Sequence, residues 1–311
     1  MRVVSRTSTP LTLTILTKNI RYATDSPFEG EERWEVRRPY LTSELLYHTA
    51  HCAESFICLQ EVLHDQLNDV LHDLNKDDEW SHIGVGRNDG QKAGEYSPIL
   101  YRPSVWKLDQ WHTTWLSRTP DKPSKGWDAG APRILTTGTF SHRMTGQKVL
   151  ANSTHLDERG SRSRLEAAKV ILERIRQYAG RNLEIPSFLG GDFNSESHEE
   201  AYLEVTSDGS PMADLRDLVP IQKQYGDINT FSGFTLDTRR KRIDFIFLSG
   251  ANSKSPTNPR NDMTSNEPHG PTNPPEGPWL ADGYAVIPNC FEDGVYNSDH
   301  QSVVGTVRLS R

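Results

Sequence analysis

The sequence predicts an α/β protein built as one large domain around a mixed, largely buried sheet system. Segments with strand and helix patterns are mixed over the whole length, and no linker or internal repeat divides them. The chain has 311 residues, of which 34% are hydrophobic, so it is long enough to bury a large core. We therefore expect a single domain over residues 1–311. A division into two domains near residue 145 is the weaker alternative.

The first half of the chain contains one predicted helix between several predicted strands. The stretch LTLTILTKNI at residues 11–20 alternates and is rich in Thr, Leu and Ile, which is typical of a strand. RRPYLTSELLYHTAHC at residues 37–52 predicts a helix, with Pro39 in its first turn and leucines on one face. Further strands are predicted at SFICLQEV (55–62), YSPILYRPSVW (96–106), TGTFSHR (137–143) and KVLANSTHL (148–156).

The second half contains the clearest helix of the chain, SRSRLEAAKVILERIRQYAG at residues 161–180. Gly180 ends this helix. Its apolar stripe consists of Leu165, Ala168, Ile171, Leu172, Ile175 and Tyr178. PSFLGGDFNS (186–195), RIDFIFLSG (242–250) and QSVVGTV (301–307) predict short buried strands. Residues 249–278 are rich in Pro, Asn, Ser and Gly, so we expect a flexible loop there.

Charge and cysteine content exclude several classes of protein. The net charge of −7 and the pI of about 5.9 argue against a dedicated nucleic-acid coat protein, although an enzyme with a basic cleft remains compatible. Three cysteines give no disulfide framework, and Cys58 is expected to be a buried free thiol. No apolar run approaches the ~20 residues that a membrane helix needs. We expect a monomer in the cytoplasm that has no membrane partner, or a secreted protein if a signal peptide has been removed.

Polar side chains lie at or just beyond the ends of five predicted strands. Each of them alone can be explained by local structure, such as a helix cap or a turn. Five such ends in one chain instead indicate convergence on one cleft, where open α/β sheets place their ligands. The side chains are Asn19, Gln60, Glu61, His155, Asp192, Asn194, Asp299 and His300.

The chemistry of this set fits attack of water on phosphorus. The acids and amides are hard oxygen ligands, which suit Mg²⁺, with Mn²⁺ as an alternative, rather than a thiolate zinc site. His155 and His300 are candidates for general acid and base, and Asp299 is the expected partner that fixes the tautomer of His300. If the chain between Asp192 and Asn194 is extended, their side chains point to the same side, where they can hold water and phosphate.

Seven motifs resemble those of the endonuclease/exonuclease/phosphatase superfamily, which includes DNase I, abasic-site endonucleases, deadenylases and inositol-polyphosphate 5-phosphatases. They are LTKNI, LQEV, GEYSPILYRP, STHLD, GGDFNS, RIDFIF and SDH, in the family's order between residues 13 and 309. LQEV, GDFNS and SDH in that order are the most specific. The resemblance implies a DNase I-like four-layer sandwich, in which two mixed sheets pack face to face with helices outside.

The resemblance also implies a role for each matching residue. Glu61 and Asn19 would be the central Mg²⁺ ligands, and Asp192 and Asn194 would hold the nucleophilic water and the scissile phosphate. The remaining positions that correspond to family residues are His155 (phosphate oxygens), Glu95 (partner of His155), His300 with Asp299 (metal or phosphate contact and base) and Asp244 (a carboxylate near that pair).

Two departures from DNase I argue against a similar grip on duplex DNA. The Arg that enters the minor groove, two residues after the metal-binding Glu, is replaced by Leu63, and the groove-stacking Tyr is replaced by Ala93.

Weaker substrate candidates lie in loops and at a helix start. Trp115, Trp127 and Arg133 belong to the polar stretch at residues 112–133, which forms either a substrate pocket or a well-packed surface loop. Arg164, in the first turn of the 161–180 helix, reaches either a phosphate or a salt-bridge partner. Asp157 and Glu158 are expected to face solvent.

We expect a Mg²⁺-dependent phosphoesterase that uses in-line attack of water on a phosphate ester. The first hypothesis is a nuclease for single-stranded RNA or DNA, of the 3′-5′ exonuclease or deadenylase kind. The alternative is a phosphatase or phosphodiesterase of a small metabolite, such as a sugar or inositol phosphate. An inactive binding module is the third hypothesis, and it is disfavoured because a competent residue occupies each catalytic position.

Overall fold

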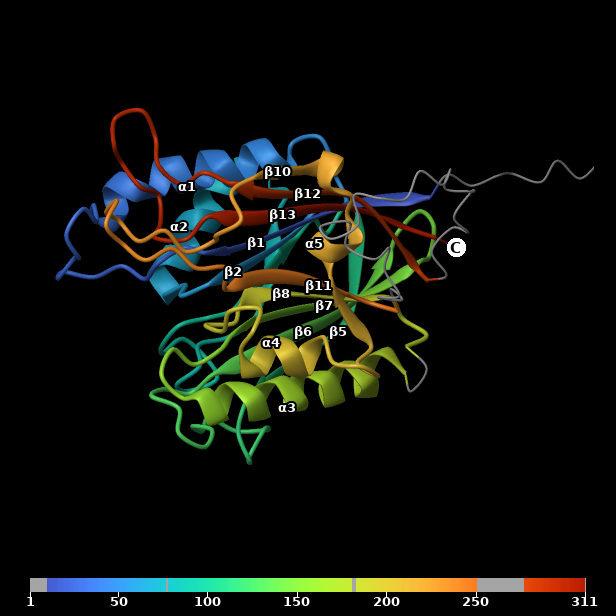
Figure 1. The fold of residues 1–311 in the computed structure, drawn as a ribbon. Coiled ribbons are helices and arrows are strands. Elements are labelled where there is room, and N and C mark those ends of the chain that lie inside the picture. The colour runs from blue at the N-terminus through green and yellow to red at the C-terminus, as the bar shows by residue number, and fades with distance from the viewer. Residues whose placement is uncertain (1–9, 77, 181–182, 251–276, 311) are drawn as a thin grey trace, which may run out of the picture.

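Two β-sheets pack face to face, with helices on the outer side of each (Figure 1). The computed structural model describes residues 10–76, 78–180, 183–250 and 277–310. The layers run from α1 and α2 through the two sheets to α3 and α4 (Figure 1). This arrangement confirms the four-layer sandwich of two mixed sheets that the family resemblance implied.

The first sheet has seven strands in the order β10-β12-β13-β1-β2-β4-β3. Its central strands β1 and β2 run parallel, whereas β13 and β4 pair with them in the antiparallel direction. The bounds are β1 Leu11–Asn19, β2 Phe56–Gln60, β3 Ser81–Ile83, β4 Ile99–Tyr101, β10 Gln224–Gly226, β12 Trp279–Ile287 and β13 Ser302–Leu309.

The second sheet has six strands in the order β5-β6-β7-β8-β11-β9. Strands β7 and β8 run parallel, and β11 pairs antiparallel to β8. The bounds are β5 Trp106–Trp115, β6 Ile134–His142, β7 Lys148–His155, β8 Ser187–Asp192, β9 Met212–Asp214 and β11 Asp244–Ser249.

The helices are α1 (Trp34–Thr49), α2 (His64–Leu74), α3 (Ser161–Ala179), α4 (Glu200–Val205), α5 (Leu215–Leu218) and the 3-10 helix η1 (Ile221–Lys223). The predicted bounds of α3 are confirmed to within one residue. The predicted place of Pro39 is wrong, because α1 begins at Trp34 and Pro39 therefore lies in its second turn. A proline there removes one intrahelical hydrogen bond, which the packing of the helix must offset.

Three apolar clusters hold the layers together. The central cluster lies between the sheets and includes Phe56, Phe140 and Phe188. The second joins α3 and α4 to the second sheet, and the third joins α1 and α2 to the first. The sheets approach closely at Gly190, where a Cβ would lie 3.2 Å from the Cβ atoms of Thr17 and Cys58. Any larger residue at this position would push the sheets apart.

The parallel strands set the position of the polar residues. Because β1 runs parallel to β2, and β7 to β8, the carboxyl ends of each pair lie together. A hydrogen bond of 3.0 Å from Asn19 Nδ2 to Asp192 Oδ2 then joins the end of β1 to the end of β8. The strand ends of both sheets therefore meet at one edge of the sandwich.

The expected flexible loop at 249–278 falls almost entirely on residues 251–276, which lie outside the described residues. None of the helices in the described part of the chain is long and apolar enough to cross a membrane.

Candidate active site

Asp192 lies at the centre of the polar cluster, at the end of β8, and its side chain is buried. Its Oδ1 accepts a hydrogen bond from the backbone N–H of Asn194 at 2.8 Å. Its Oδ2 accepts from Asn19 Nδ2 at 3.0 Å and lies 3.4 Å from His155 Nε2 and 3.7 Å from His300 Nε2. One carboxylate oxygen therefore faces three of the residues that the sequence singles out.

Glu61 follows β2 in a left-handed backbone conformation, with φ of 58°. Non-glycine residues rarely adopt this conformation, and such strain is found preferentially at functional sites. The carboxylate accepts from Asn19 Nδ2 at 3.0 Å and from the backbone N–H of Tyr22 at 3.1 Å, and Arg21 Nη1 lies 3.9 Å away. Glu61 and Asp192 thus converge on the same side-chain amide.

His155 ends β7 and is held by Asn194. Asn194 Nδ2 lies 3.1 Å from His155 Nε2 and also donates to the backbone oxygen of Leu156 at 3.1 Å. Because the amide N–H₂ of Asn194 can only donate, Nε2 is the accepting nitrogen and the ring proton belongs on Nδ1. His155 Nδ1 lies 3.6 Å from Glu95 Oε2, beyond hydrogen-bond distance.

Glu95 is held by Arg87, a residue that the sequence did not single out. The guanidinium of Arg87 donates to both carboxylate oxygens, at 2.6 and 2.8 Å, and both side chains are largely buried. Such a bidentate pair fixes the orientation of the carboxylate. The two residues lie on either side of a turn between β3 and β4, and no sequence pattern marks Arg87 as a partner of Glu95.

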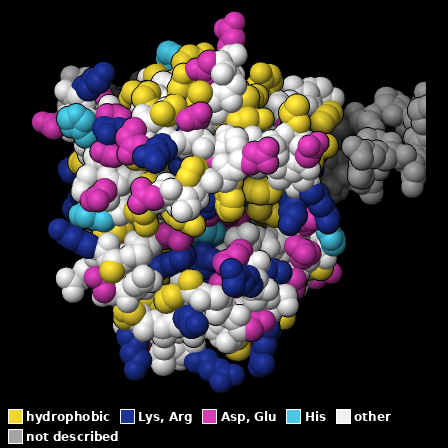
Figure 2. Space-filling model, turned by 90° about the vertical axis from the view of Figure 1, so that its left-hand side faces the viewer, with side chains coloured by type: hydrophobic (Ala, Val, Ile, Leu, Met, Phe, Trp, Pro, Cys, Tyr) yellow, Lys and Arg dark blue, Asp and Glu magenta, His cyan; other side chains and the backbone are white. Residues whose placement is uncertain are grey.

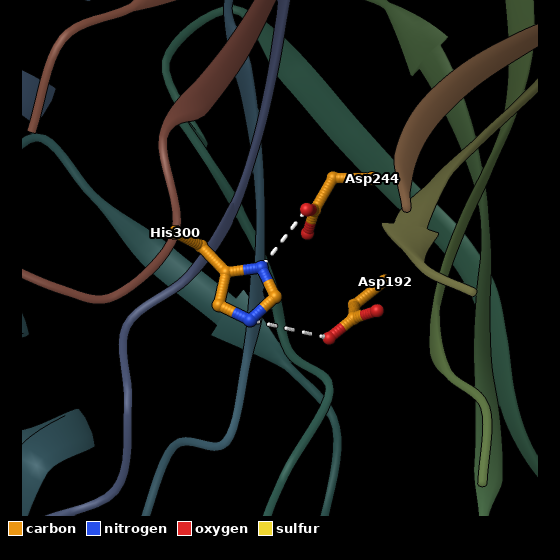
Figure 3. Close-up of side chains that lie close together, drawn as sticks. All are labelled: Asp192, Asp244 and His300. Atoms are coloured by element: carbon orange, nitrogen blue, oxygen red, sulfur yellow. Dashed lines mark hydrogen bonds and ion pairs between the residues drawn. The ribbon is translucent and has the colours of Figure 1, made fainter. Parts of the chain in front are cut away.

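His300 is oriented by Asp244, not by its neighbour Asp299. Its Nδ1 lies 2.9 Å from Asp244 Oδ2, and its Nε2 faces Asp192 (Figure 3). The side chain of Asp299 instead lies 3.3 Å from Ser298 Oγ. The expected contact between Asp299 and His300 is therefore wrong. Adjacent residues in extended chain point to opposite sides, whereas the start of β11 brings Asp244 across the cleft.

The two histidines differ in charge: the pKa of His155 is lowered and that of His300 is raised. Burial and the nearby charge of Arg133 lower the pKa of His155 to about 4, so its imidazole is neutral at neutral pH. Burial acts in the same direction on His300, but the charges of Asp244 and Asp192 outweigh it and raise the pKa to about 10. Burial and the charge of Asp244 also raise the pKa of Asp192. Titratable groups that their surroundings drive apart in this way are typical of catalytic sites.

Asn194 differs from the extended conformation that the sequence predicted. Its φ is 46°, and its backbone N–H is turned back onto Asp192. The side chains of Asp192 and Asn194 nevertheless reach the same histidine, His155, from two directions. The tight turn achieves the predicted convergence by a different geometry.

The oxygen donors fit a divalent cation. Glu61 Oε1 and Asp192 Oδ2 each accept a hydrogen bond of 3.0 Å from Asn19 Nδ2, so two carboxylate oxygens converge on one spot, which a neutral amide N–H₂ group fills. Carboxylate and amide oxygens are the ligands that Mg²⁺ prefers. Ligand atoms of Asp192, Asp244 and His300 also lie within 4.8 Å of one another, as a buried Asp–Asp–His cluster. In that cluster the hydrogen bond between His300 and Asp244 already occupies one atom of each, so the Glu61 side fits a hard cation better.

The substrate candidates lie close to the site but are mostly engaged by protein groups. Arg164 pairs with Glu200 at 2.7 Å and donates to a backbone oxygen, so it is a salt-bridged residue. Arg133 pairs with Asp157 at 3.3 Å and with Glu158. Asp157 is buried, and its carboxylate also accepts hydrogen bonds from three backbone N–H groups at 3.1 Å or less. The expectation that Asp157 faces solvent is therefore wrong.

The stretch at residues 112–133 is partly strand. Its first four residues end β5, and Trp115 is buried there, with its indole N–H donating to the backbone oxygen of Arg87 at 2.8 Å. Trp115 is thus a packing residue. Trp127 is half-buried, with a left-handed φ of 37°.

A buried network behind the site was not foreseen. Lys18 Nζ lies 3.3 Å from Glu44 Oε1 and 2.8 Å from Asn297 Oδ1, and Asn297 donates to Glu44 at 2.7 Å. Ser298 Oγ donates to the backbone oxygen of Asn19 at 2.7 Å. These contacts fix the segment that carries Asp299 and His300 against the end of β1. The residues lie up to 279 positions apart, so no local pattern could reveal them.

The cluster has the elements needed to hydrolyse an ester of an oxyacid. Converging carboxylates can hold a cation, a neutral imidazole and an amide can contact a negatively charged group, and a second imidazole is held between carboxylates. The chain is similar in sequence and fold to known proteins. The sequence model of the Endonuclease/Exonuclease/phosphatase family matches residues 19–266, while no curated protein matches the chain.

Solved structures of similar proteins span nearly the whole chain. An endonuclease/exonuclease/phosphatase family protein from Bacteroides thetaiotaomicron is 27% identical, with a TM-score of 0.80, and the match covers 98% of this chain and 100% of that one. A mannosyl-6-phosphatase from the same species is 28% identical, with a TM-score of 0.77, over 95% and 99%. D. rerio TDP2, crystallised with a single-stranded DNA product, shares the fold at 20% identity and a TM-score of 0.64, over 95% and 98%.

Proposed function

The chain belongs to the endonuclease/exonuclease/phosphatase family, whose members are phosphoesterases, and from this premise we propose that it is a divalent-metal-dependent phosphatase of a small phosphorylated metabolite. The observation that carries the proposal is the convergence of Asn19, Glu61 and Asp192 with one neutral and one positively charged histidine at one edge of the sandwich. A phosphate group placed there meets cation ligands, a donor and proton-transfer groups together.

Glu61 and Asp192 would hold the metal ion, with Asp299 as a further oxygen ligand. Asn19 Oδ1, which accepts from the backbone N–H of Arg21 at 2.9 Å, would join them through its second lone pair. Bound there, Mg²⁺ would act as a Lewis acid that neutralises charge on the phosphoryl oxygens. The left-handed turn at Glu61 aims its carboxylate at this position, and the backbone N–H of Tyr22 keeps it there. Asp244 would orient His300 through its Oδ2.

The chain's own residues would transfer the protons and stabilise the charge that develops on the phosphoryl group. Asp192 and Asn194 orient the attacking water, and Asp192 accepts a proton from it, for which its raised pKa is suited. His155, neutral and held by Asn194, directs Nδ1–H at a phosphoryl oxygen or at Glu95. His300, kept positive by Asp244, stabilises the charge that develops on the phosphoryl group.

Three features favour a small substrate. The mannosyl-6-phosphatase is 28% identical to this chain, whereas TDP2, at 20% identity, shares only the fold. The chain is acidic, with a net charge of −7. The groove-reading positions of DNase I-like enzymes hold Leu63 and Ala93. The nuclease hypothesis stays a prediction, and it competes directly with the phosphatase in the test below.

The test is hydrolysis by purified protein with Mg²⁺ on a panel of substrates. The panel contains hexose phosphates, inositol phosphates, a 3′-tailed single-stranded RNA, a single-stranded DNA and a duplex DNA. We expect free phosphate from at least one metabolite, intact oligonucleotides, and no activity in the Glu61→Ala variant. Shortened oligonucleotides that are absent with Glu61→Ala would instead establish the nuclease, and activity that survives Glu61→Ala would refute the metal assignment.

A further inference from the structure

A cationic pocket lies at the start of α3, the helix that follows β7. It has a volume of about 430 Å³ and is lined by Arg118, Thr119, Lys125, Trp127, Asp128 and Arg162. All but Arg162 come from the loop between β5 and β6, which we call the 117–133 loop. Lys and Arg side chains gather across the middle and lower part of this end of the molecule (Figure 2).

The three cations of the pocket have no acidic partner within the described part of the chain. Neighbouring arginines do: Arg133 pairs with Asp157 and Glu158, Arg164 with Glu200, and Arg174 with Asp121. The single carboxylate of the pocket, Asp128, accepts from the backbone N–H of Ser163, in the first turn of α3, at 2.7 Å. Three cations against this one carboxylate leave the pocket with excess positive charge on a chain whose net charge is −7.

The pocket is firmly attached to the catalytic edge. Asp157, which is buried two residues after His155, accepts from the backbone N–H groups of Gly130 and Ala131 at 3.0 and 3.4 Å. Arg133, at the other end of the same segment, donates to Asp157 at 3.3 Å. Since β7 ends at His155, these bonds fix the 117–133 loop to the strand end that carries the candidate catalytic imidazole.

We propose that this pocket binds a second phosphate group of the substrate, so that the preferred substrates are small molecules with two phosphate groups. The inference rests on the proposed function, since the first phosphate would occupy the site at Asp192. Two guanidiniums and an ammonium offer the fork and point-charge donors that phosphate oxygens accept. The indole of Trp127 supplies a flat apolar surface for the carbon skeleton between the two groups.

The kinetic test compares a hexose 6-phosphate with the matching hexose 1,6-bisphosphate. We expect the wild-type protein to have the lower KM for the bisphosphate. Arg162→Gln and Lys125→Gln should each raise that KM by about tenfold, the effect of one charge-assisted hydrogen bond, with kcat unchanged. The KM for the monophosphate should stay within about twofold, because that substrate leaves the pocket empty.

Arg176→Gln is the matched control. Arg176 lies on the same helix, fourteen residues or roughly 21 Å further along, and lines a different surface pocket. It should leave both KM values unchanged. If Arg176→Gln raised the KM for the bisphosphate as much as the pocket variants do, the effect would come from the overall charge of the protein and not from the pocket, and the proposal would be wrong. Unchanged KM values with Arg162→Gln and Lys125→Gln would overturn the proposal.

Binding of inorganic phosphate separates failure of this proposal from failure of the proposed function. Calorimetry in EDTA measures the pocket without catalysis or metal. We expect binding that Arg118→Gln and Arg162→Gln weaken by about tenfold and that Arg176→Gln preserves. If the protein hydrolyses no phosphate ester but shows this pattern, the pocket is a phosphate site and the proposed reaction is wrong. Binding that no pocket variant changes would refute the pocket itself.

Discussion

The buried ion pair of Lys18 and Glu44 provides the sharpest test of the structure behind the site. The side chains are 0% and 4% exposed, and Lys18 Nζ has only Glu44 and Asn297 as partners among the described residues. Glu44→Gln keeps the shape of the side chain but removes the only carboxylate in contact with this ammonium. Burial already lowers the pKa of Lys18, and without Glu44 only the smaller effects of the Asp244 and Asp299 charges oppose it.

The expected cost is large. Removing one partner of a buried pair and leaving the other charge uncompensated costs about 3–5 kcal/mol. With an entropy of unfolding of about 2.1 cal/mol/K per residue for the 311 residues, this lowers Tm by roughly 5–8 °C. Asn297 contacts both Lys18 and Glu44, and it lies shortly before Asp299 and His300 in the chain. The loss of Glu44 should therefore disturb these two residues and lower kcat, whereas KM should change less.

Thermal unfolding followed by circular dichroism measures this effect. The matched control is Glu166→Gln, which breaks a surface pair with Lys169 at 3.2 Å, and it should change Tm by less than about 1 °C. The Lys18→Met/Glu44→Gln double variant should regain part of the loss, because no buried charge remains. Equal shifts for Glu44→Gln and Glu166→Gln would refute the argument.

Four further outcomes are expected. Asp244→Asn should lower kcat by about ten- to a hundredfold, because a buried charge-assisted hydrogen bond is lost. It should also lower the pKa of His300, so that the alkaline limb of the kcat–pH profile moves to lower pH; an unchanged pH profile would contradict this. Burial raises the pKa of Cys58 to about 12, so the unfolded chain loses this proton first, and the free energy of unfolding should fall above pH ~9, less so in Cys58→Ala. A thiol reagent should modify exposed Cys290 and spare Cys58 in the native protein; modification of both at equal rates would be inconsistent. Phe188→Ala, at the centre of the sandwich, should cost about 3–5 kcal/mol in urea unfolding, and a loss below ~1 kcal/mol would show that the sheets do not pack there.

The sequence was informative where a side chain's role depends on its own strand. Asn19, Glu61, His155 and Asp192 follow short apolar runs, and the rule that parallel strand ends meet at one edge of a sheet was enough to bring them together. The clearest helix, α3, was predictable because its apolar stripe recurs at helical spacing. The expected single domain and monomeric state stay predictions.

The sequence was uninformative where a contact crosses the sandwich. The choice of Asp244 over Asp299 as partner of His300 depends on how β11 lies against the segment before β13, and adjacency in the chain pointed to the wrong residue. The bidentate pair of Arg87 and Glu95 depends on a turn whose path has no periodic pattern. Strand β12 also escaped prediction, since Asp282 and Gly283 interrupt its apolar residues.

The most direct test of the central claim measures the Mg²⁺-dependent release of phosphate from mannose 6-phosphate and from mannose 1,6-bisphosphate. It compares the wild type with Glu61→Ala and Asp192→Asn. The account predicts turnover by the wild type that EDTA abolishes and Mg²⁺ restores. Both variants should lose at least a hundredfold in kcat while keeping the wild-type circular dichroism spectrum. Turnover that persists in EDTA or in folded Glu61→Ala would contradict the assignment of this edge of the sandwich as a metal-dependent phosphoesterase site.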